Sequence, residues 1–198
     1  RQVYTYSFEK AVTIREKLHV EQNLVIGHVG RFDAQKNHTF LLDIFSECVN
    51  IVPNARLLLV GDGEGRTQIQ EKAKSLGLEE KVIFTGVRND VADLLQAMDV
   101  FVFPSLYEGV PVTMIEAQAS GLPCVISDGV PKDCVITSGL VTSMKLSDRP
   151  CDWAKHIAAQ LNRKRENHLE EIQAAGYDIV TAAKELENFY LKKYGEES

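Results

Sequence analysis

The chain has 198 residues, of which 44% are hydrophobic and 25% charged, as in an ordinary globular domain. Its formal net charge of -6 argues against nonspecific binding of nucleic acid, because a phosphate backbone requires a basic face. No apolar run approaches the ~20 residues that span a bilayer, and no signal-peptide pattern is visible. These properties predict one soluble domain with a single buried core.

Apolar runs of strand length alternate along the chain with stretches of helical period. In chain order the predicted elements are a strand over 24–29, a helix over 38–52, a strand over 56–60, a helix over 67–76, a strand over 82–85, a helix over 90–98, a strand over 100–103, a helix over 111–120, a strand over 123–127, and helices over 151–162 and 178–194. Asn37 is the expected N-cap of the first of these helices, and Gly77 ends the second. An amphipathic stretch from Phe8 to Leu18 precedes them all.

The predicted strands are continuously hydrophobic, which indicates that helices cover both faces of a parallel sheet. The expected fold class is therefore α/β, with a doubly wound, Rossmann-like parallel sheet. Ligands of such sheets bind beyond the carboxyl ends of the strands, so the loops there are expected to face one crevice. These five loops cover residues 30–36, 61–65, 86–89, 105–111 and 128–131.

The spacing of the cysteines and a search for metal-binding and nucleophile motifs limit the kinds of site that the sequence predicts. The four cysteines show no paired spacing, and Cys48 and Cys124 lie in apolar runs, so we interpret them as free thiols in a reducing cytoplasm. The sequence has no Asp-x-Asp pair, HExxH, GxSxG or Walker loop, and no metal is expected. His28, inside a strand, is interpreted as a hydrogen-bonded residue near the core.

A predicted helix start at Pro111 has the features of an anion site. Proline has its φ pre-set for this position, and Gly109 permits close approach of the backbone to a ligand. The amides of Val112 and Thr113 then point outward with the helix dipole behind them. This end of the helix is expected to bind a phosphate group.

Two carboxylates flank that helix start. Glu116 lies one turn inside the helix and leans back toward its N-terminus, and Glu108 lies in the preceding loop. Beside an anion site, carboxylates are expected to accept hydrogen bonds from hydroxyl groups, such as those of a sugar and a ribose. The alternative is that Glu116 is an ordinary exposed charge and that Glu108 only complements the helix dipole.

The loop after the first strand carries two cations, Arg31 and Lys36. Arginine grips a phosphate with two donors and lysine acts as a point charge, although either side chain could also be an ordinary surface charge. The GDGEG turn is not a dinucleotide fingerprint, because Arg66 occupies the third glycine position and the turn follows the second strand. We interpret that turn as a tight acidic loop near the ligand.

Taken together, these segments resemble the family 4 retaining glycosyltransferases of the GT-B fold, of the type that serves bacterial polysaccharide synthesis. The resemblance covers about residues 24–133 and includes "GHVGRFDAQKNH", "LLLVGDGEGR", "VIFTGVRNDV", "DVFVFPSLYEGVPVTMIEAQASGLPCVIS" and "DGVPKD". The spacing of seven residues between Glu108 and Glu116 is the signature of this family. The chain is therefore expected to be the donor-binding, C-terminal half of a GT-B enzyme.

The resemblance implies a role for each candidate site residue. Arg31, Lys36 and Glu108 are the expected catalytic residues, the first two on the donor diphosphate and the third on the transferred sugar. The expected donor-binding residues are Gly30, Gly86, Val87, Arg88, Gly109, Val110, Pro111, Val112, Thr113 and Glu116. Among these, Glu116 would hold the ribose hydroxyls, and the loop 86–88 would meet the nucleobase. Many members carry an aromatic residue and a glycine where this chain has Val110 and Pro111, which leaves the sugar open.

The same resemblance implies a metal-independent hexosyl transfer from a nucleotide sugar, for which a uridine diphosphate sugar is the expected donor. No cofactor is expected. Residues 1–22 would then be an interdomain linker and first helix, 23–175 the nucleotide-sugar-binding domain, and 176–198 a helix that packs back toward an N-terminal acceptor domain absent from this chain. A fragment without the acceptor domain is expected to be inactive, and peripheral membrane association of the full enzyme stays open.

Three other functions fit parts of the pattern. A nucleotide-sugar 2-epimerase has the same fold and the same kind of ligand, but the Arg31–Lys36 loop and the Glu108 segment favour transfer. A noncatalytic nucleotide-sugar-binding module would also explain the crevice. A purely structural α/β domain would bind no nucleotide.

Overall fold

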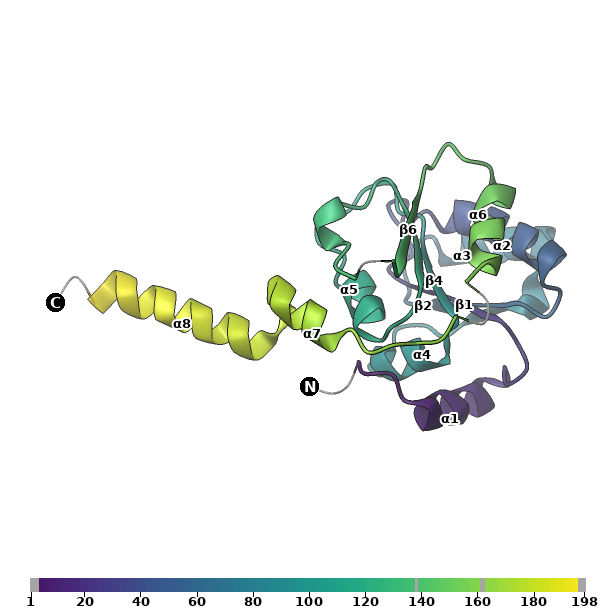
Figure 1. Ribbon diagram of the computed structural model, residues 1–198. Helices are drawn as coiled ribbons and strands as arrows, with labels where there is room; N and C mark the ends of the chain where they lie inside the picture. The colour runs from purple at the N-terminus through teal and green to yellow at the C-terminus, as the bar shows by residue number, and fades with distance from the viewer. Residues whose placement is uncertain (1–3, 138, 161–162, 196–198) are drawn as a thin grey trace.

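The computed structural model describes residues 4–137, 139–160 and 163–195 as an α/β domain with a projecting C-terminal helix (Figure 1). Its strands form one parallel sheet in the order β3-β2-β1-β4-β5-β6. The strands are β1 (Val25–Val29), β2 (Arg56–Val60), β3 (Val82–Phe84), β4 (Val100–Phe103), β5 (Cys124–Ser127) and β6 (Val141–Met144). The strand order reverses between β1 and β4, which is the expected doubly wound topology. Sheets of this topology commonly bind ligands beyond the strand ends at such a point.

Helices cover both faces of the sheet. The longer helices are α1 (Phe8–Leu18), α2 (His38–Ile51), α3 (Arg66–Ser75), α4 (Val91–Ala97), α5 (Val112–Ala119), α6 (Pro150–Ala158) and α8 (Ile179–Gly195). Shorter helical segments are α7 (Leu169–Ile172), η1 (Glu79–Lys81), η2 (Lys132–Cys134) and η3 (Gln173–Tyr177). The apolar sides of α2, α3 and α6 pack on one face of the sheet, and those of α1, α4 and α5 on the other.

The strands explain why both faces must be covered. All five residues of β1 are buried, as are all four of β4 and of β5, so side chains of successive residues enter the two opposite cores. Leu57 and Leu59 of β2 pack with α2 and α3, whereas Leu58 packs with the helices of the other face. The prediction of a parallel sheet between two helical layers is confirmed.

Some details of the predicted elements are wrong. Strand β6 was not predicted, because this edge strand of four residues includes the polar pair Thr142 and Ser143 and only Met144 is buried. Asn37 stands at the N-cap position but makes no side-chain cap, since its backbone is left-handed at φ 54°. Its side-chain amide donates instead to the Pro104 carbonyl oxygen at 3.1 Å. Residues 161–162, the end of a predicted helix, lie outside the described residues.

All four cysteines are free thiols, as expected. Cys48, Cys124 and Cys134 are buried, and burial raises the pKa of each of these thiols above its ordinary value. A thiol with a raised pKa is a poor nucleophile. Cys48, Cys124 and Cys134 therefore act as small apolar packing residues.

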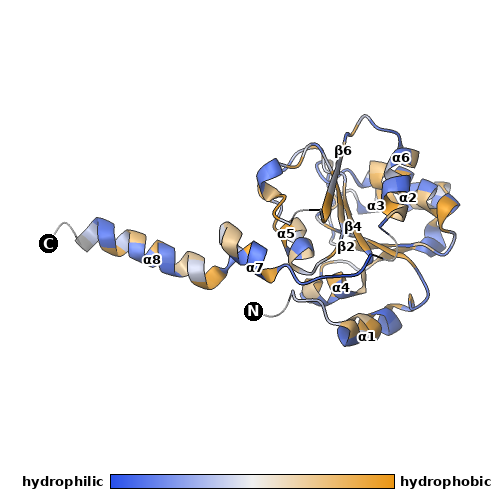
Figure 2. Cartoon of the chain, viewed as in Figure 1, coloured by the Kyte–Doolittle hydropathy of each residue, from blue (hydrophilic) through white to orange (hydrophobic). Residues whose placement is uncertain are grey.

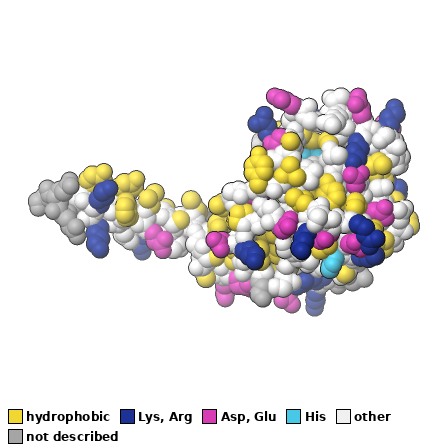
Figure 3. All heavy atoms as spheres, turned by 90° about the horizontal axis from the view of Figure 1, so that it is seen from above, with side chains coloured by type: hydrophobic (Ala, Val, Ile, Leu, Met, Phe, Trp, Pro, Cys, Tyr) yellow, Lys and Arg dark blue, Asp and Glu magenta, His cyan; other side chains and the backbone are white. Residues whose placement is uncertain are grey.

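Helix α8 extends away from the sheet domain, as Figure 1 shows. Apolar residues recur along it, visible as orange turns in Figure 2 and as yellow spheres on the projecting arm in Figure 3. Its exposed large apolar side chains are Ile179, Val180, Leu186, Phe189, Tyr190, Leu191 and Tyr194. Such a row of apolar side chains is uncommon on the surface of a folded domain and typically marks an interaction site.

In the described part of the chain, no helix combines the length and the apolar character needed to cross a bilayer.

Candidate donor-binding site

The five loops at the carboxyl ends of the strands touch one another in sequence along the sheet edge. The Gly61 amide donates to the Gly86 carbonyl oxygen at 2.9 Å, and the Phe32 amide donates to the Asp62 carbonyl oxygen at 3.0 Å. On the other side, the Leu106 amide donates to the Gln35 carbonyl oxygen at 2.8 Å. The Glu108 amide then donates to the Gly129 carbonyl oxygen at 3.1 Å, which joins the fifth loop. The five loops are therefore neighbours along this edge of the sheet, whereas the cavity described below is lined by residues of only two of them.

Lys36 and Glu108 form an ion pair at the switch point between β1 and β4. The Lys36 ammonium donates to Glu108 Oε1 at 2.7 Å, and the two side chains are only 17% and 5% exposed. The Lys36 ammonium nitrogen also lies 4.8 Å from the centre of the Phe103 ring. The π face of the ring attracts a cation. Coulomb attraction is strong here because little water screens the pair. Two of the predicted site residues are therefore in direct contact.

The N-terminus of α5 lies beside the end of β1. Pro111 is the N-cap residue and not the first helical residue that the sequence predicts, because its ψ of 89° is not helical and α5 begins at Val112. The Thr113 hydroxyl donates to the Val29 carbonyl oxygen at 3.4 Å. The first amides of a helix have no carbonyl partner within it, so those of Val112 and Thr113 are directed outward. Gly109 is exposed, and a Cβ built on it meets nothing within 4 Å. The geometry suits an anion at this helix end, next to Lys36.

Glu116 has a partner that the sequence did not suggest. The Tyr4 hydroxyl donates to Glu116 Oε1 at 2.5 Å, across 112 residues of chain. Burial raises the pKa of the Glu116 carboxyl above its ordinary value, and the bond from Tyr4 opposes that rise. Burial, followed by the nearby carboxylate, raises the pKa of Tyr4 well above its ordinary value. Glu116 thus already accepts a hydroxyl hydrogen bond, the kind of bond expected of it with a ribose.

The loop after β3 is exposed at residues 87–89. Gly86 has φ 70°, and Val87 is 77% exposed. Arg88 is turned onto Asp90 by two hydrogen bonds of 2.8 and 2.6 Å, so its guanidinium is engaged within the loop. The arrangement is consistent with contact to a ligand through main chain and the Val87 side chain.

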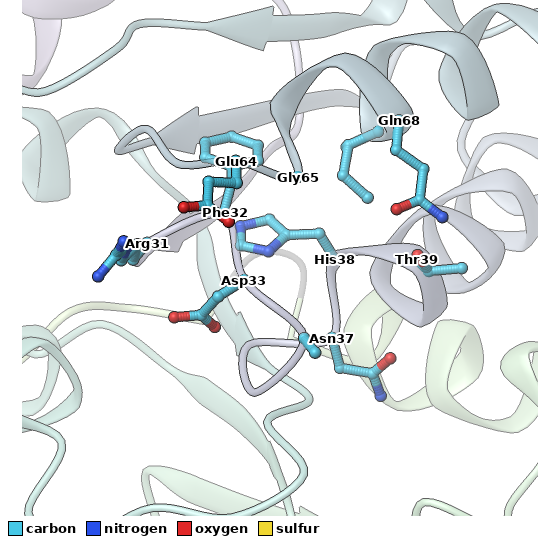
Figure 4. A pocket seen from close by; sticks show the side chains of 11 residues that line it. Arg31, Phe32, Asp33, Asn37, His38, Thr39, Glu64, Gly65 and Gln68 are labelled. Atoms are coloured by element: carbon cyan, nitrogen blue, oxygen red, sulfur yellow. The ribbon is translucent and has the colours of Figure 1, made fainter.

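Arg31 belongs to the same loop as Lys36 but lies apart from the Lys36–Glu108 pair. Its side chain is exposed and lines a cavity of about 570 Å³ between this loop and α3, of which Lys36 and Glu108 are not lining residues. Figure 4 shows the Arg31 side chain directed away from His38, which lines the same cavity. The structure therefore does not bring Arg31 into contact with Lys36 or Glu108.

His28 and His38 lie beneath this loop with neighbouring rings 4.6 Å apart. Burial lowers the pKa of His38 to about 4 and that of His28 well below its ordinary value, so both are neutral at pH 7. His28 is fully buried, as expected, with Nδ1 2.9 Å from the Val102 carbonyl oxygen. The expectation of a hydrogen-bonded histidine near the core is confirmed, although its Nε2 has no hydrogen-bond partner among the described residues.

Three residues of the site were missed in the sequence. Phe103 supports the Lys36 ammonium, Tyr4 bonds to Glu116, and Gln35 donates its side-chain amide to Glu108. Phe103 ends a predicted strand and Gln35 lies in the predicted loop, so the topology offered a signal for both. Tyr4 offered none, because its approach depends on the path of the N-terminal segment. Within the described ranges, no group of three or more His, Cys, Asp or Glu side chains is arranged to hold a metal ion.

Comparisons with known proteins agree with this architecture. Residues 23–163 match the family model described as glycosyl transferases group 1. EpsF of Bacillus subtilis (strain 168), which carries the name of a glycosyltransferase, is 42% identical over 170 residues, 84% of this chain and 44% of EpsF. The Vi polysaccharide biosynthesis protein VipC/TviE of Salmonella typhi is 33% identical over 160 residues, 78% of this chain and 28% of that protein.

A solved structure shows the same fold. Anabaena HepE in complex with UDP-glucose has a TM-score of 0.80 and 25% identity, over 96% of this chain and 55% of HepE. The chain thus spans less than two thirds of the length of each of these proteins. Since the family model covers well over half of the chain, the chain belongs to the group 1 glycosyl transferases of the GT-B fold.

Proposed function

We propose that this chain binds the uridine diphosphate sugar donor of a retaining, metal-independent hexosyltransferase in polysaccharide biosynthesis. The observation that carries the proposal is the Lys36–Glu108 pair beside the N-terminus of α5, at the switch point of the sheet. HepE, which shares the fold, was crystallised with UDP-glucose, and VipC/TviE is named for polysaccharide biosynthesis. These names support the donor class and the pathway class of the proposal.

The proposed chemistry follows from the charges that develop during transfer. Breaking the bond between the anomeric carbon and the diphosphate leaves negative charge on phosphate and positive charge on the sugar. Lys36 and the amide end of α5 would stabilise the phosphate, and Arg31 would join them once its exposed side chain turns toward the ligand. These groups would supply the charge that a metal ion supplies elsewhere. Glu108 would accept hydrogen bonds from sugar hydroxyls.

We propose that the anomeric configuration is retained because the acceptor hydroxyl attacks the same face of the sugar from which the diphosphate leaves. Glu108, the buried carboxylate of the site, is already paired with Lys36 and Gln35, which suits hydrogen bonding better than nucleophilic attack. A 2-epimerase would bind the same donor class. On an assembly that includes an acceptor domain, transfer to an acceptor and epimerisation of the donor separate the two functions.

The exposed apolar row on α8 supports the proposed domain organisation. We propose that residues 176–198 cover an acceptor-binding domain that is not in this chain, and that residues 1–22 connect to it. The apolar side chains Leu186, Phe189 and Tyr190 would be buried in that contact. Without such a domain the chain would bind donor but transfer no sugar.

Donor binding is tested directly by calorimetry and thermal shift on the 198-residue chain, with UDP, UDP-glucose and ADP, with and without EDTA. A ligand that binds only the folded state raises the melting temperature. We expect UDP and UDP-glucose each to raise the melting temperature of the chain by the same amount with EDTA as without it. If no nucleotide binds, the chain behaves as a structural domain and the proposal is wrong.

Glu116→Gln provides a test of the ribose contact. The neutral amide accepts hydrogen bonds more weakly than a carboxylate, so we expect UDP to bind about tenfold more weakly. The loss should be smaller for 2′-deoxy-UDP, which lacks one of the hydroxyl donors. Calorimetry with both ligands gives the two ratios, and Tyr4→Phe controls for the existing bond to Glu116. Equal losses for both ligands would remove Glu116 from the ribose site.

A further inference from the structure

Gln35 joins the two loops that form the proposed sugar site. Its backbone carbonyl oxygen accepts from the Leu106 amide at 2.8 Å. Its side-chain Nε2 donates to the Tyr107 carbonyl oxygen at 3.0 Å and to Glu108 Oε2 at 3.2 Å. Three consecutive residues of the β4–α5 loop are therefore held by one residue of the β1–α2 loop.

The orientation of the Gln35 amide is fixed by its partners. A carbonyl oxygen and a carboxylate oxygen both accept hydrogen bonds, and only the NH₂ group of the amide offers two donors. Turning the amide over would point its oxygen at two acceptors. The side chain therefore has one favourable orientation, and a carboxylate in its place would face the Glu108 carboxylate.

Each carboxylate oxygen of Glu108 accepts a hydrogen bond from a different residue of the β1–α2 loop. Oε1 receives the Lys36 ammonium and Oε2 receives the Gln35 amide, and the carboxylate is held with its side chain 5% exposed. A buried carboxylate with one partner could rotate, whereas bonds to both oxygens fix the plane of the group. The proposed function also assigns Lys36 to the diphosphate, and its bond to Glu108 would weaken when a phosphate draws on the same ammonium.

We propose that Gln35 is a positioning residue that keeps Glu108 oriented toward the sugar while Lys36 engages the diphosphate. This inference rests on the proposed function, because Glu108 is the residue through which Gln35 would act. Gln35 then affects recognition of the sugar and leaves recognition of the nucleoside diphosphate nearly unchanged. A group held by rigid neighbours loses little entropy on binding, which is the physical source of the effect.

The test compares UDP with UDP-glucose on the full chain by calorimetry. For Gln35→Ala we expect the Kd of UDP-glucose to rise about tenfold and that of UDP by less than about twofold. Gln35→Glu keeps the size of the side chain but replaces the donor with a second carboxylate, so it should lose at least as much UDP-glucose affinity. Gln70→Ala, an exposed glutamine on α3, is the matched control and should change neither Kd.

A double-mutant cycle separates positioning from simple bracing of the loop. In the Glu108→Ala background, Gln35→Ala should add less than about twofold to the Kd of UDP-glucose, because the carboxylate that Gln35 orients is gone. An undiminished tenfold loss in that background overturns the proposal, as does a parallel loss of UDP binding by Gln35→Ala. If the unmodified chain binds neither ligand, the proposed function fails and this inference fails with it. If the unmodified chain binds both ligands and Gln35→Ala changes neither Kd, only this inference fails.

Discussion

Replacing Lys36 by alanine is expected to weaken binding of UDP about a hundredfold. Charge-assisted hydrogen bonds to a phosphate in a poorly solvated site contribute about 1.5–3 kcal/mol each, and a hundredfold corresponds to about 2.7 kcal/mol. The ammonium of Lys36 has three donors, one of which already meets Glu108, so it has donors left for a phosphate. Calorimetric titration of UDP into the variant measures the loss.

The same change should also lower the stability of the free protein, by about 2 kcal/mol. The Glu108 side chain is almost fully buried, and without Lys36 its charge keeps, among the described residues, only the Gln35 amide as a side-chain partner. Lys155→Ala is the matched control. It removes one positive charge from an exposed ion pair with Asp152 at 3.3 Å on α6, and exposed pairs contribute little. Unchanged UDP affinity in Lys36→Ala would exclude Lys36 from the phosphate site.

The sheet and the meeting of the five loops were predictable because they follow from topology. Carboxyl ends of parallel strands share one edge, so Lys36 after β1 and Glu108 after β4 had to approach each other at the switch point. The glutamate spacing and Pro111 located the helix start to within one residue without knowledge of any contact. These inferences needed only the periodicity of the strands and the positions of loop residues relative to them.

The side-chain directions within the site were not predictable in the same way. Nothing in the spacing of Arg31 and Lys36 shows that the first side chain is exposed while the second is held by Glu108 and Phe103. Asn37 adopts a left-handed backbone that turns its amide from the helix end to Pro104. Tyr4 reaches Glu116 because its side chain packs against Ile115 and Ala119 of α5. Such choices depend on how loops pack against each other, which sequence patterns do not report.

Gly61→Ala is expected to destabilise the protein by about 3 kcal/mol and to disturb two loops of the proposed donor site together. Gly61 has φ 135°, a conformation that side chains rarely adopt, and an added Cβ would lie 2.1 Å from the Gly30 carbonyl oxygen. Backbone strain and overpacking each contribute about 1–3 kcal/mol. For a chain of this size, a loss of about 3 kcal/mol lowers the melting temperature by about 6–12 °C, which calorimetry measures.

Gly77→Ala separates the two causes of that loss. Gly77 also has a positive φ, 69°, but an added Cβ would meet nothing within 4 Å, so only backbone strain of about 1 kcal/mol is expected. Gly61 additionally donates its amide to Gly86, so relief of the clash with Gly30 by movement of Gly61 must shift the β3–α4 loop. We therefore expect Gly61→Ala, and not Gly77→Ala, to reduce UDP affinity. Equal melting temperatures for the two variants would show that close packing of Gly61 against Gly30 does not support the site.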